Sequence, residues 1–331
     1  DEVSPASLQY IECHATSTQV GDATEISALH EAMEGAFAPG ARIPIGSVKG
    51  NIGHTLECAG LAGMCKAIQA LRHGVIPPQP SINELNPEIA WNDIPFYVPT
   101  QAEAWPDVNE HGVRRAAVNA FGIGGLNSHV VLDDRPEPQR ATQSTVPADI
   151  TSADKSDKDD LIAVIGVGVI APDANNQDEF WSLISSGRSA VSEVTDNRWL
   201  SSEYHQGAAG PRGTTSKLGG FVTNFEFDWK KHRIPPKQIQ NSNPLQYMLL
   251  DAADQAFIDA GLGDMKFARE RASVVVGTMF GGDFSSHMQG GLRLPVIQRE
   301  LKKALMADGV QEAQADEIIA RYREHTLNLY P

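Results

Sequence analysis

A histidine and a lysine close together in the sequence have the residue types needed to stabilise a developing anion. His54 follows the turn-forming residues Gly50, Asn51 and Gly53, and an Ala/Gly/Leu-rich stretch that predicts a helix begins directly after it. At a helix N-terminus the free N–H groups and the positive end of the dipole disfavour an imidazolium, so His54 is expected to be neutral at pH 7. Lys49 supplies a cation nearby, and a cation beside a neutral imidazole suits an anion-stabilising site. The alternative is a surface histidine on a capped helix.

The strands expected around these residues place them at one edge of a sheet. An apolar run at 8–13 predicts a buried strand with His14 just after it, and residues 43–48 predict the next strand. A helix over 23–37, with Asp22 as its N-cap, is expected between them. Alternating strands and helices predict a parallel α/β sheet, whose ligands gather at the C-terminal ends of the strands. The two histidines are therefore expected to meet in space.

The chain contains three cysteines, Cys13, Cys58 and Cys65, which are too few and too unevenly placed for a disulfide framework. A reducing, cytoplasmic location is therefore expected. Cys58 and Cys65 fall on the helical face of His54, but C-x-x-C pairs are missing and small apolar residues surround both, so we expect core residues rather than metal ligands. Cys13 beside His14 suggests a nucleophile and a base. Adjacent strand residues point to opposite faces, which argues against that pairing.

Composition and charge restrict the function classes. With 331 residues, of which 41% are hydrophobic and 21% charged, the chain is expected to be a soluble globular protein of one large or two smaller domains. Its net charge of −15 argues against nucleic-acid binding. No apolar run is long enough to predict a membrane span, and no secretory leader opens the chain. The chain starts without methionine, so we expect it to be a piece of a longer protein.

A glycine-rich loop is expected between two strands within residues 114–134. The runs RAAVNAF and SHVVL favour strands, and Gly122, Gly124 and Gly125 lie between them. A phosphate-binding dinucleotide loop has to open a helix, whereas a strand follows here. The glycines are therefore expected to bring the backbone close to a substrate, where N–H groups can form half of an oxyanion hole.

Residues 135–160 are rich in Pro, Ser, Thr and Asp and predict a flexible linker between a first unit at 1–134 and a second at 161–331. The second unit is expected to hold two helices and a buried strand, followed by two amphipathic helices; the first three are expected at 177–186, 244–260 and 273–280.

Gly166, Gly168 and Ala171 fit a G-x-G-x-x-A pattern after an expected strand, which is the argument for a nicotinamide-dependent oxidoreductase. The helix is not expected to begin before Gln177, too far along for its N-terminus to hold a pyrophosphate.

Three stretches of the first unit, ECHATSTQVGDATE, SVKGNIGHTLECAGLAG and VNAFGIGGLNSHVVL, resemble in their order the signatures of the C-terminal half of a β-ketoacyl synthase. LIAVIGVGVIAP, FWSLISSGRSAVSEVTDNRW, LGGFV and NPLQYMLLDAADQAF are similar to the N-terminal half of another domain of that family. The resemblance implies an α/β, thiolase-like fold of layered α-β-α-β-α type, present as two partial domains. It also implies a tandem of ketosynthase and chain length factor, as in polyunsaturated fatty acid synthases and type I polyketide synthases.

The activity implied by the resemblance is a decarboxylative Claisen condensation. A cysteine takes an acyl chain from an acyl carrier protein, malonyl on a carrier protein loses CO₂, and its carbanion attacks the acyl thioester. His14 and His54 match the two histidines that promote decarboxylation and stabilise the enolate. Lys49 matches a lysine that orders the site. No cofactor is expected to bind directly, because phosphopantetheine arrives on the carrier protein.

The same resemblance assigns roles to five further residues. Thr16 and Thr18 match hydroxyls that bind the pantetheine amides, and Glu25 matches a structural acid. Phe121 and Ile123 match a gating loop, in which the N–H of Ile123 is expected to form half of the oxyanion hole.

Departures from the family pattern limit what the chain is expected to do alone. The nucleophilic cysteine is expected outside the chain for both units, so the isolated chain is expected to be inactive. Cys13 and Ala15 stand where Ala and Gly are usual. Asn243 and Tyr247 replace the Asp and Arg of a D-P-x-x-R helix start, which favours a non-catalytic chain length factor for the second unit.

Three function classes stay open. The first is a condensing enzyme served by acyl carrier proteins. The second is a structural segment that folds by pairing with the missing halves of its two domains and contributes a dimer surface, in a homodimer or a ketosynthase–chain length factor heterodimer. The third is the nicotinamide-dependent oxidoreductase.

Overall fold

The computed structural model describes residues 3–106, 112–134, 162–196, 198–205, 213–240, 242–263, 267–278 and 282–329. The expected linker at 135–160 lies outside these residues. The chain forms two compact units, the first from residues 1–225 and 252–273, the second from 226–251 and 274–331.

The first unit is built on a five-stranded sheet in the order β4-β2-β1-β6-β7. Its strands are β1 (Tyr10–Glu12), β2 (Ile43–Gly46), β4 (Phe96–Tyr97), β6 (Arg115–Phe121) and β7 (Asn127–Asp133). The first four strands of this order pair in parallel, and β7 is antiparallel to β6. The prediction of a parallel α/β sheet is confirmed. As a consequence, the C-terminal ends of β1, β2 and β6 lie at one edge.

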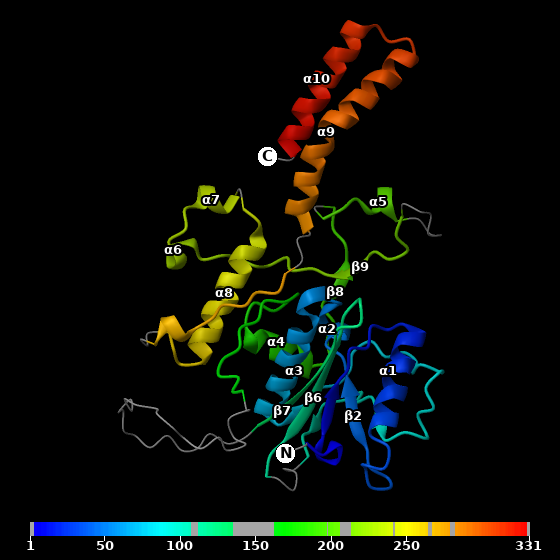
Figure 1. The fold of residues 1–331 in the computed structure, drawn as a ribbon, viewed down its shortest axis with the longest axis vertical. Coiled ribbons are helices and arrows are strands. Elements are labelled where there is room, and N and C mark those ends of the chain that lie inside the picture. The colour runs from blue at the N-terminus through cyan, green and yellow to red at the C-terminus, as the bar shows by residue number, and fades with distance from the viewer. Residues whose placement is uncertain are drawn as a thin grey trace. The chain divides into compact units, whose positions relative to one another are not determined.

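Two helices cover the sheet on opposite faces, α1 (Gln19–Ala32) and α3 (Ala59–His73) (Figure 1). Successive strand residues point to opposite faces. Ile11 therefore packs in one core with Ile26 of α1, and Tyr10 packs in a second core with Ala67 of α3. Both strand residues are completely buried. A sheet covered on both faces in this way holds its strand ends rigidly.

Helix α1 starts earlier than predicted. Thr18, with an extended backbone, takes the N-cap position, so the prediction of Asp22 as the N-cap is wrong. Asp22 lies in the first turn of the helix, where Oδ1 accepts the backbone N–H of Ser17 at 3.1 Å. Ser17 has a φ of 64°, and this left-handed residue turns the chain back towards the helix before the expected start.

The segment before His54 also differs from the prediction. Strand β2 ends at Gly46, and a short helix, α2 (Lys49–Ile52), follows in place of a strand end and turn. Gly53, with a φ of 78°, stops this helix, because few other residues adopt that backbone conformation. A single 3-10 turn, η2 (Leu56–Cys58), then precedes α3, so the long helix begins at residue 59 rather than 55.

Two glycines of α3, Gly60 and Gly63, allow the helix to lie close to the sheet. A Cβ at Gly60 would lie 3.0 Å from Cβ of Ala120. A Cβ at Gly63 would lie 3.1 Å from Cγ of Glu12 and 3.3 Å from Cγ1 of Val118. Larger side chains at these two positions would push the helix away from β1 and β6.

Part of the predicted second unit packs within the same compact body. Helix α4 (Gln177–Ser185) matches its predicted span and buries Phe180 against Val48 and Ile52. The antiparallel pair β8 (Val191–Glu193) and β9 (Leu218–Gly220) lies beside α2. The same compact unit contains a second antiparallel pair, β3 (Val75–Ile76) and β5 (Glu103–Ala104), the short helix α5 (Ser201–Tyr204), and the 3-10 helices η1 (Pro5–Ser7) and η4 (Arg269–Arg271). The strand expected within 161–172 is not formed over residues 162–170.

The second compact unit, residues 226–251 and 274–331, is helical. Its elements are α6 (Trp229–His232), α7 (Pro236–Gln240), α9 (Gly282–Ala307) and α10 (Glu312–Leu329), and α8 (Pro244–Asp259) contains residues of both units. Helices α9 and α10 pack against each other, in agreement with the two predicted amphipathic helices.

The prediction of a buried strand at 273–280 is wrong for residues 273–278, which the structure describes. Residues 273–278 form no strand, and Val274 and Val275 are 91% and 92% exposed. A β-branched run becomes a strand only when a neighbouring strand pairs with it, and no strand in the described part of the chain does so.

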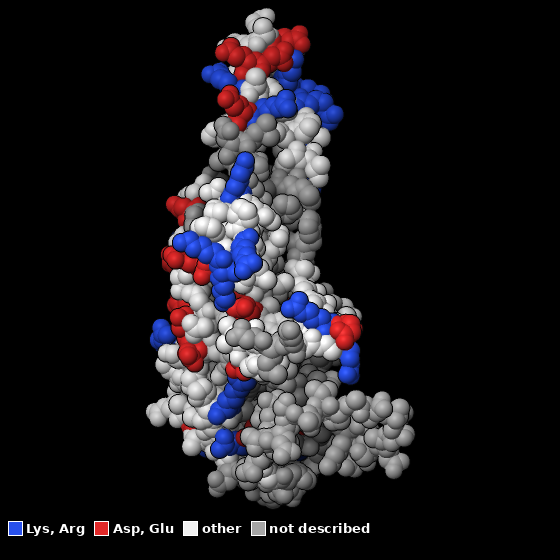
Figure 2. Space-filling model, turned by 90° about the vertical axis from the view of Figure 1, so that its left-hand side faces the viewer, with Lys and Arg blue, Asp and Glu red and all other residues white. Residues whose placement is uncertain are grey.

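Lys and Arg side chains lie among Asp and Glu side chains on the face that Figure 2 shows, without a continuous basic band. None of the helices in the described ranges combines the length and the apolar character needed to cross a membrane.

The close approach of α3 to the sheet gives a stability prediction. Gly63→Val should lower the free energy of unfolding by about 1–3 kcal/mol, because the added side chain meets Glu12 and Val118. Gly291→Val is the matched control, since a Cβ at Gly291 of α9 has nothing within 4 Å. It should change stability by no more than about 0.5 kcal/mol. Urea denaturation measures both, and equal effects would contradict the packing account.

Candidate active site

His14 and His54 lie next to each other at the C-terminal edge of the sheet. His14 is the second residue after β1, and His54 follows α2 and Gly53. The centroids of the two imidazole rings are 5.5 Å apart, with the ring planes at 82°. The ring of Phe121, the last residue of β6, is centred 5.3 Å from that of His14. The strand ends thus bring together side chains from three separate segments of the sequence.

Backbone hydrogen bonds indicate the same neutral tautomer for both histidines. Nδ1 of His54 accepts the N–H of Leu56 at 3.0 Å, and Nδ1 of His14 accepts the N–H of Phe121 at 3.3 Å. A ring nitrogen that accepts a hydrogen bond carries no proton, so the proton of the neutral ring is on Nε2. Each histidine therefore offers one Nε2–H donor.

The surroundings also lower the basicity of these groups. Partial burial lowers the pKa of both His14 and His54, and the Lys49 ammonium lowers both further; for His14, Glu25 acts in the opposite direction. Burial lowers the pKa of Lys49 as well, with Glu12 and Glu25 opposing that shift. The expectation of a neutral imidazole beside a cation agrees with these shifts, but their causes are burial and Lys49. The expected helix N-terminus is not the cause, because α3 begins only at Ala59.

A buried carboxylate shapes the loop that carries His14. Glu25 of α1 accepts the backbone N–H groups of His14 and Ala15, both at 2.8 Å, and the side-chain amide of Asn119 at 2.9 Å. The Asn119 oxygen lies 2.7 Å from Nδ1 of His129. Sequence reasoning did not identify Asn119 or His129. The available signal was that Asn119 is the polar residue within the apolar run of β6.

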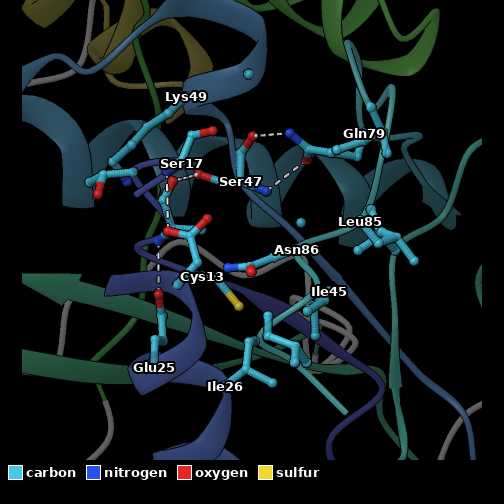
Figure 3. A pocket seen from close by; sticks show the side chains of 18 of the residues that line it. Cys13, Ser17, Glu25, Ile26, Ile45, Ser47, Lys49, Gln79, Leu85 and Asn86 are labelled. Carbon is cyan, nitrogen blue, oxygen red and sulfur yellow. Dashed lines mark hydrogen bonds between the residues drawn. The ribbon is translucent and has the colours of Figure 1, made fainter. Parts of the chain in front are cut away.

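A cavity of about 590 Å³ opens beside the site (Figure 3). Its polar lining includes Thr16, Thr18, Lys49 and His54, and its apolar lining includes Ile26, Ile45, Leu85, Ile89, Trp91 and Val98. A pocket of this size with a mixed lining can hold a ligand with an apolar part and a hydrogen-bonding part. Thr16 and Thr18 are exposed at this lining, and His54 is also exposed.

Gln79 is a second residue that sequence reasoning missed. Its side-chain oxygen accepts the N–H of Ser47 at 2.8 Å, and its side-chain nitrogen donates to the carbonyl of Ser47 at 3.0 Å. The Ser47 hydroxyl in turn donates to the carbonyl of Ala15 at 3.2 Å. These bonds tie the end of β2 to the loop of His14. No local pattern marks Gln79, because it lies in a Pro-rich segment 32 positions from its partner.

The predicted gating residues occupy a hairpin turn. Gly122 N–H donates to the carbonyl of Leu126 at 2.8 Å, and Gly124 and Gly125 have positive φ values. Phe121 contacts His14, but the Ile123 side chain is fully exposed. The structure therefore brings Phe121, and not the side chain of Ile123, to the imidazole of His14.

The cysteines differ in their surroundings. Cys13 is buried in the core under α1, and burial raises its pKa well above the ordinary value. Burial raises the pKa of Cys65 to about 11. Thiols with raised pKa values are poor nucleophiles. Cys58 is exposed, so the prediction that it is a core residue is wrong. It ends the 3-10 turn η2, which lies before α3 and buries none of its residues. Within the described ranges, no group of three His, Cys, Asp or Glu residues is placed to hold a metal ion.

The glycines of the G-x-G-x-x-A pattern pack against a helix. A Cβ at Gly166 would lie 2.1 Å from the carbonyl oxygen of Ala256, and one at Gly168 would lie 1.9 Å from that of Ala252. Both carbonyls belong to α8. Close helix packing accounts for these glycines, and the geometry gives no support to a dinucleotide site.

The influence of Lys49 on both imidazoles can be measured by NMR. His14 and His54 should titrate below their ordinary pKa of 6.5, and Lys49→Met should move both pKa values up, because it removes a cation that disfavours protonation. Arg42→Met is the control, since Arg42 precedes β2 at the opposite end of that strand and stacks on Tyr97. Unchanged histidine titrations in Lys49→Met would contradict the assignment.

The same shifts set the sign of a stability effect. A histidine with a lowered pKa binds fewer protons folded than unfolded as the pH falls below 6.5. The stability contributed by the neutral rings is therefore complete above pH 6.5 and is lost as the pH falls through the folded pKa.

Comparison with protein families gives matches over most of the chain. Residues 1–83 match the β-ketoacyl synthase C-terminal domain, residues 86–166 the ketoacyl-synthetase C-terminal extension, and residues 159–309 the β-ketoacyl synthase N-terminal domain. The sequence analysis did not predict this extension.

Similar proteins include large synthases. The chain is 32% identical to a polyunsaturated fatty acid synthase component of Thraustochytrium over 78% of its length, and 47% identical to highly reducing polyketide synthase cm3B of Cordyceps militaris over 38%. It spans 12% and 5% of those proteins. A solved structure, ketosynthase twelve of the bacillaene polyketide synthase from Bacillus amyloliquefaciens, is 36% identical over 40% of this chain and 24% of that chain, with a TM-score of 0.39. The chain belongs to the β-ketoacyl synthase family.

Proposed function

We propose that the chain is part of a multidomain fatty acid or polyketide synthase that catalyses decarboxylative Claisen condensation on acyl carrier proteins. The observation that carries the proposal is the pair of imidazoles, whose ring centroids are 5.5 Å apart. In each ring Nδ1 accepts a backbone N–H, which leaves the proton on Nε2 as the donor for a ligand. The similarity to a polyunsaturated fatty acid synthase and to polyketide synthases supports the same function.

Two neutral donors suit the chemistry of malonyl decarboxylation. When the malonyl thioester loses CO₂, negative charge develops on the thioester oxygen as an enolate forms. Donors that are already in place stabilise this charge without reorganisation. With the ring centroids 5.5 Å apart, the Nε2–H groups of His14 and His54 are proposed to donate to one acceptor oxygen, and Lys49 adds a positive charge that acts on both rings.

The cavity suits the arm that delivers the malonyl group. In this proposal Thr16 and Thr18 donate to the amides of phosphopantetheine, which arrives on the carrier protein rather than as a bound cofactor. Phe121 and Ile123 form the gate beside the histidines, and the N–H of Ile123 serves the oxyanion hole. Glu25 keeps the loop of His14 in place through its three hydrogen bonds.

The thiol that carries the acyl chain is proposed to lie outside this chain. Cys13 and Cys65 have raised pKa values, which disfavours them as nucleophiles. The exposure of His54 also supports an incomplete site, because condensing chemistry needs water excluded from the reactive carbanion. The isolated chain is therefore expected to be inactive.

We assign residues 1–134 to the C-terminal half of a ketosynthase, 135–160 to a linker and 161–331 to the N-terminal part of a chain length factor. The order of the family matches, C-terminal model first, supports this arrangement. Asn243 and Tyr247, in place of the Asp and Arg of the family pattern, support the non-catalytic assignment. Tyr247 is buried, its ring lies 4.8 Å from that of Phe227, and its hydroxyl donates to the carbonyl of Gln238.

A structural role is the second proposal. Ile162 is 94% exposed and Val274 is 91% exposed, although both lie in apolar runs typical of buried strands. Such runs favour pairing with further parts of the two domains, in a homodimer or a heterodimer. Native mass measurement together with limited proteolysis tests this: a monomer cut quickly within the two units would support the structural role, and a resistant monomer would contradict it.

The catalytic role of the histidines is tested in the full-length protein. His54→Ala should lower malonyl decarboxylation by about 10²–10³-fold, because it removes one donor from the enolate, and acyl loading should persist. His73→Ala is the matched control, since His73 ends α3 and stacks on Trp181 at 4.2 Å, away from the site. Decarboxylation that is unchanged in His54→Ala would remove the proposed role.

A further inference from the structure

A fully buried ion pair lies between β1, β2 and α3, close to the two histidine segments. Lys66 and Glu12 have side chains that are 0% and 1% exposed, and Nζ of Lys66 lies 3.1 Å from Oε2 of Glu12. The hydroxyl of Tyr10, which is also fully buried, donates to the same oxygen at 2.6 Å. Removing two charges from water opposes folding, so a buried pair is weak support for stability by itself. Its position between the two histidine segments points to a different role.

The other carboxylate oxygen joins the two histidine segments. Oε1 of Glu12 accepts the backbone N–H of Val48, the residue directly before α2. Glu12 is two residues before His14, and α2 leads through Gly53 to His54. One carboxylate therefore connects the strand end that carries His14 to the helix that leads to His54.

The surroundings leave this carboxylate little freedom. A Cβ at Gly46 would lie 2.8 Å from the Tyr10 hydroxyl and 3.1 Å from Nζ of Lys66, and a Cβ at Gly63 would lie 3.1 Å from Cγ of Glu12. Glycine at both positions makes room for the cluster, and the contacts on every side hold the Glu12 side chain in one position.

We propose that Glu12 is a positioning residue, which holds the His54 segment at a fixed distance from His14 while Tyr10 and Lys66 hold its carboxylate. The inference rests on the proposed condensing function. Glu12 does not touch the substrate and acts through Val48 and α2. The Glu12 carboxylate also opposes the lowering of the Lys49 pKa that burial causes.

Two charge-neutral double variants of the full-length protein separate positioning from stability. Glu12→Gln/Lys66→Met keeps an acceptor for the Val48 N–H, whereas Glu12→Leu/Lys66→Met removes it. The glutamine pair should decarboxylate malonyl at close to the original rate. The leucine pair should lose about tenfold to a hundredfold in decarboxylation, because displacing a catalytic group by about one ångström can slow the reaction by that factor. Acyl loading should stay within about twofold of the original rate. Tyr10→Phe, which removes one bond to Glu12, should show a smaller loss of the same kind.

The matched control is Arg115→Met/Asp133→Leu. This ion pair joins the first residue of β6 to the last residue of β7, at the end of β6 opposite to Phe121. The control should leave the ratio of decarboxylation to loading unchanged.

Three outcomes decide the proposal. A selective loss of decarboxylation in the leucine pair and in Tyr10→Phe supports it. Equal decarboxylation in both double variants overturns it, and so does a parallel loss of loading and decarboxylation in Tyr10→Phe, which indicates a role in stability alone. His54→Ala is measured alongside: if that variant decarboxylates normally, the condensing function fails, and if it does not, only the role of Glu12 is in question.

Discussion

Parallel pairing of β1 with both β2 and β6 is the constraint from which the site follows. Because the three strands run in the same direction, the residues that follow them emerge at one edge of the sheet. His14 follows β1, α2 and His54 follow β2, and Phe121 ends β6. Side chains from three distant parts of the sequence are neighbours for that reason, before any side-chain interaction is considered.

Side-chain interactions then fix the backbone between the strand ends and the imidazoles. Glu25 holds the loop of His14, Gln79 holds Ser47, and Glu12 holds Val48. Each of these residues is remote in sequence from at least one backbone group that it binds. The backbone segments that carry the imidazoles are therefore held by long-range hydrogen bonds. The Nδ1 of His14 accepts the N–H of the distant Phe121, and the Nδ1 of His54 accepts that of the nearby Leu56. The result is two neutral donors in a fixed arrangement, which suits charge stabilisation more than proton transfer.

Local patterns were sufficient for β1, β2, β6 and β7, for α3 apart from its first turn, and for the expectation that the histidines meet, because strand alternation and helix periodicity depend on near neighbours. The two-residue edge strand β4 was not predicted. They were not sufficient where a distant partner decides the outcome. The early start of α1 depends on the turn at Ser17, and α2 depends on contacts of Val48 with Glu12. Asn119 could not be assigned a role, since Glu25 is 94 positions away. The run at 273–278 has the composition of a strand but forms none, because strand formation also requires a neighbouring strand to pair with.

The distance between the two imidazoles carries the whole account, and solution NMR measures it directly. In protein labelled selectively at histidine, the ring protons of His14 and His54 should show a nuclear Overhauser cross-peak, because the ring centroids are 5.5 Å apart. The peak should vanish from samples in which either histidine is replaced. If both rings give assigned signals and no cross-peak joins them, the two side chains are not neighbours and the account of the site is contradicted.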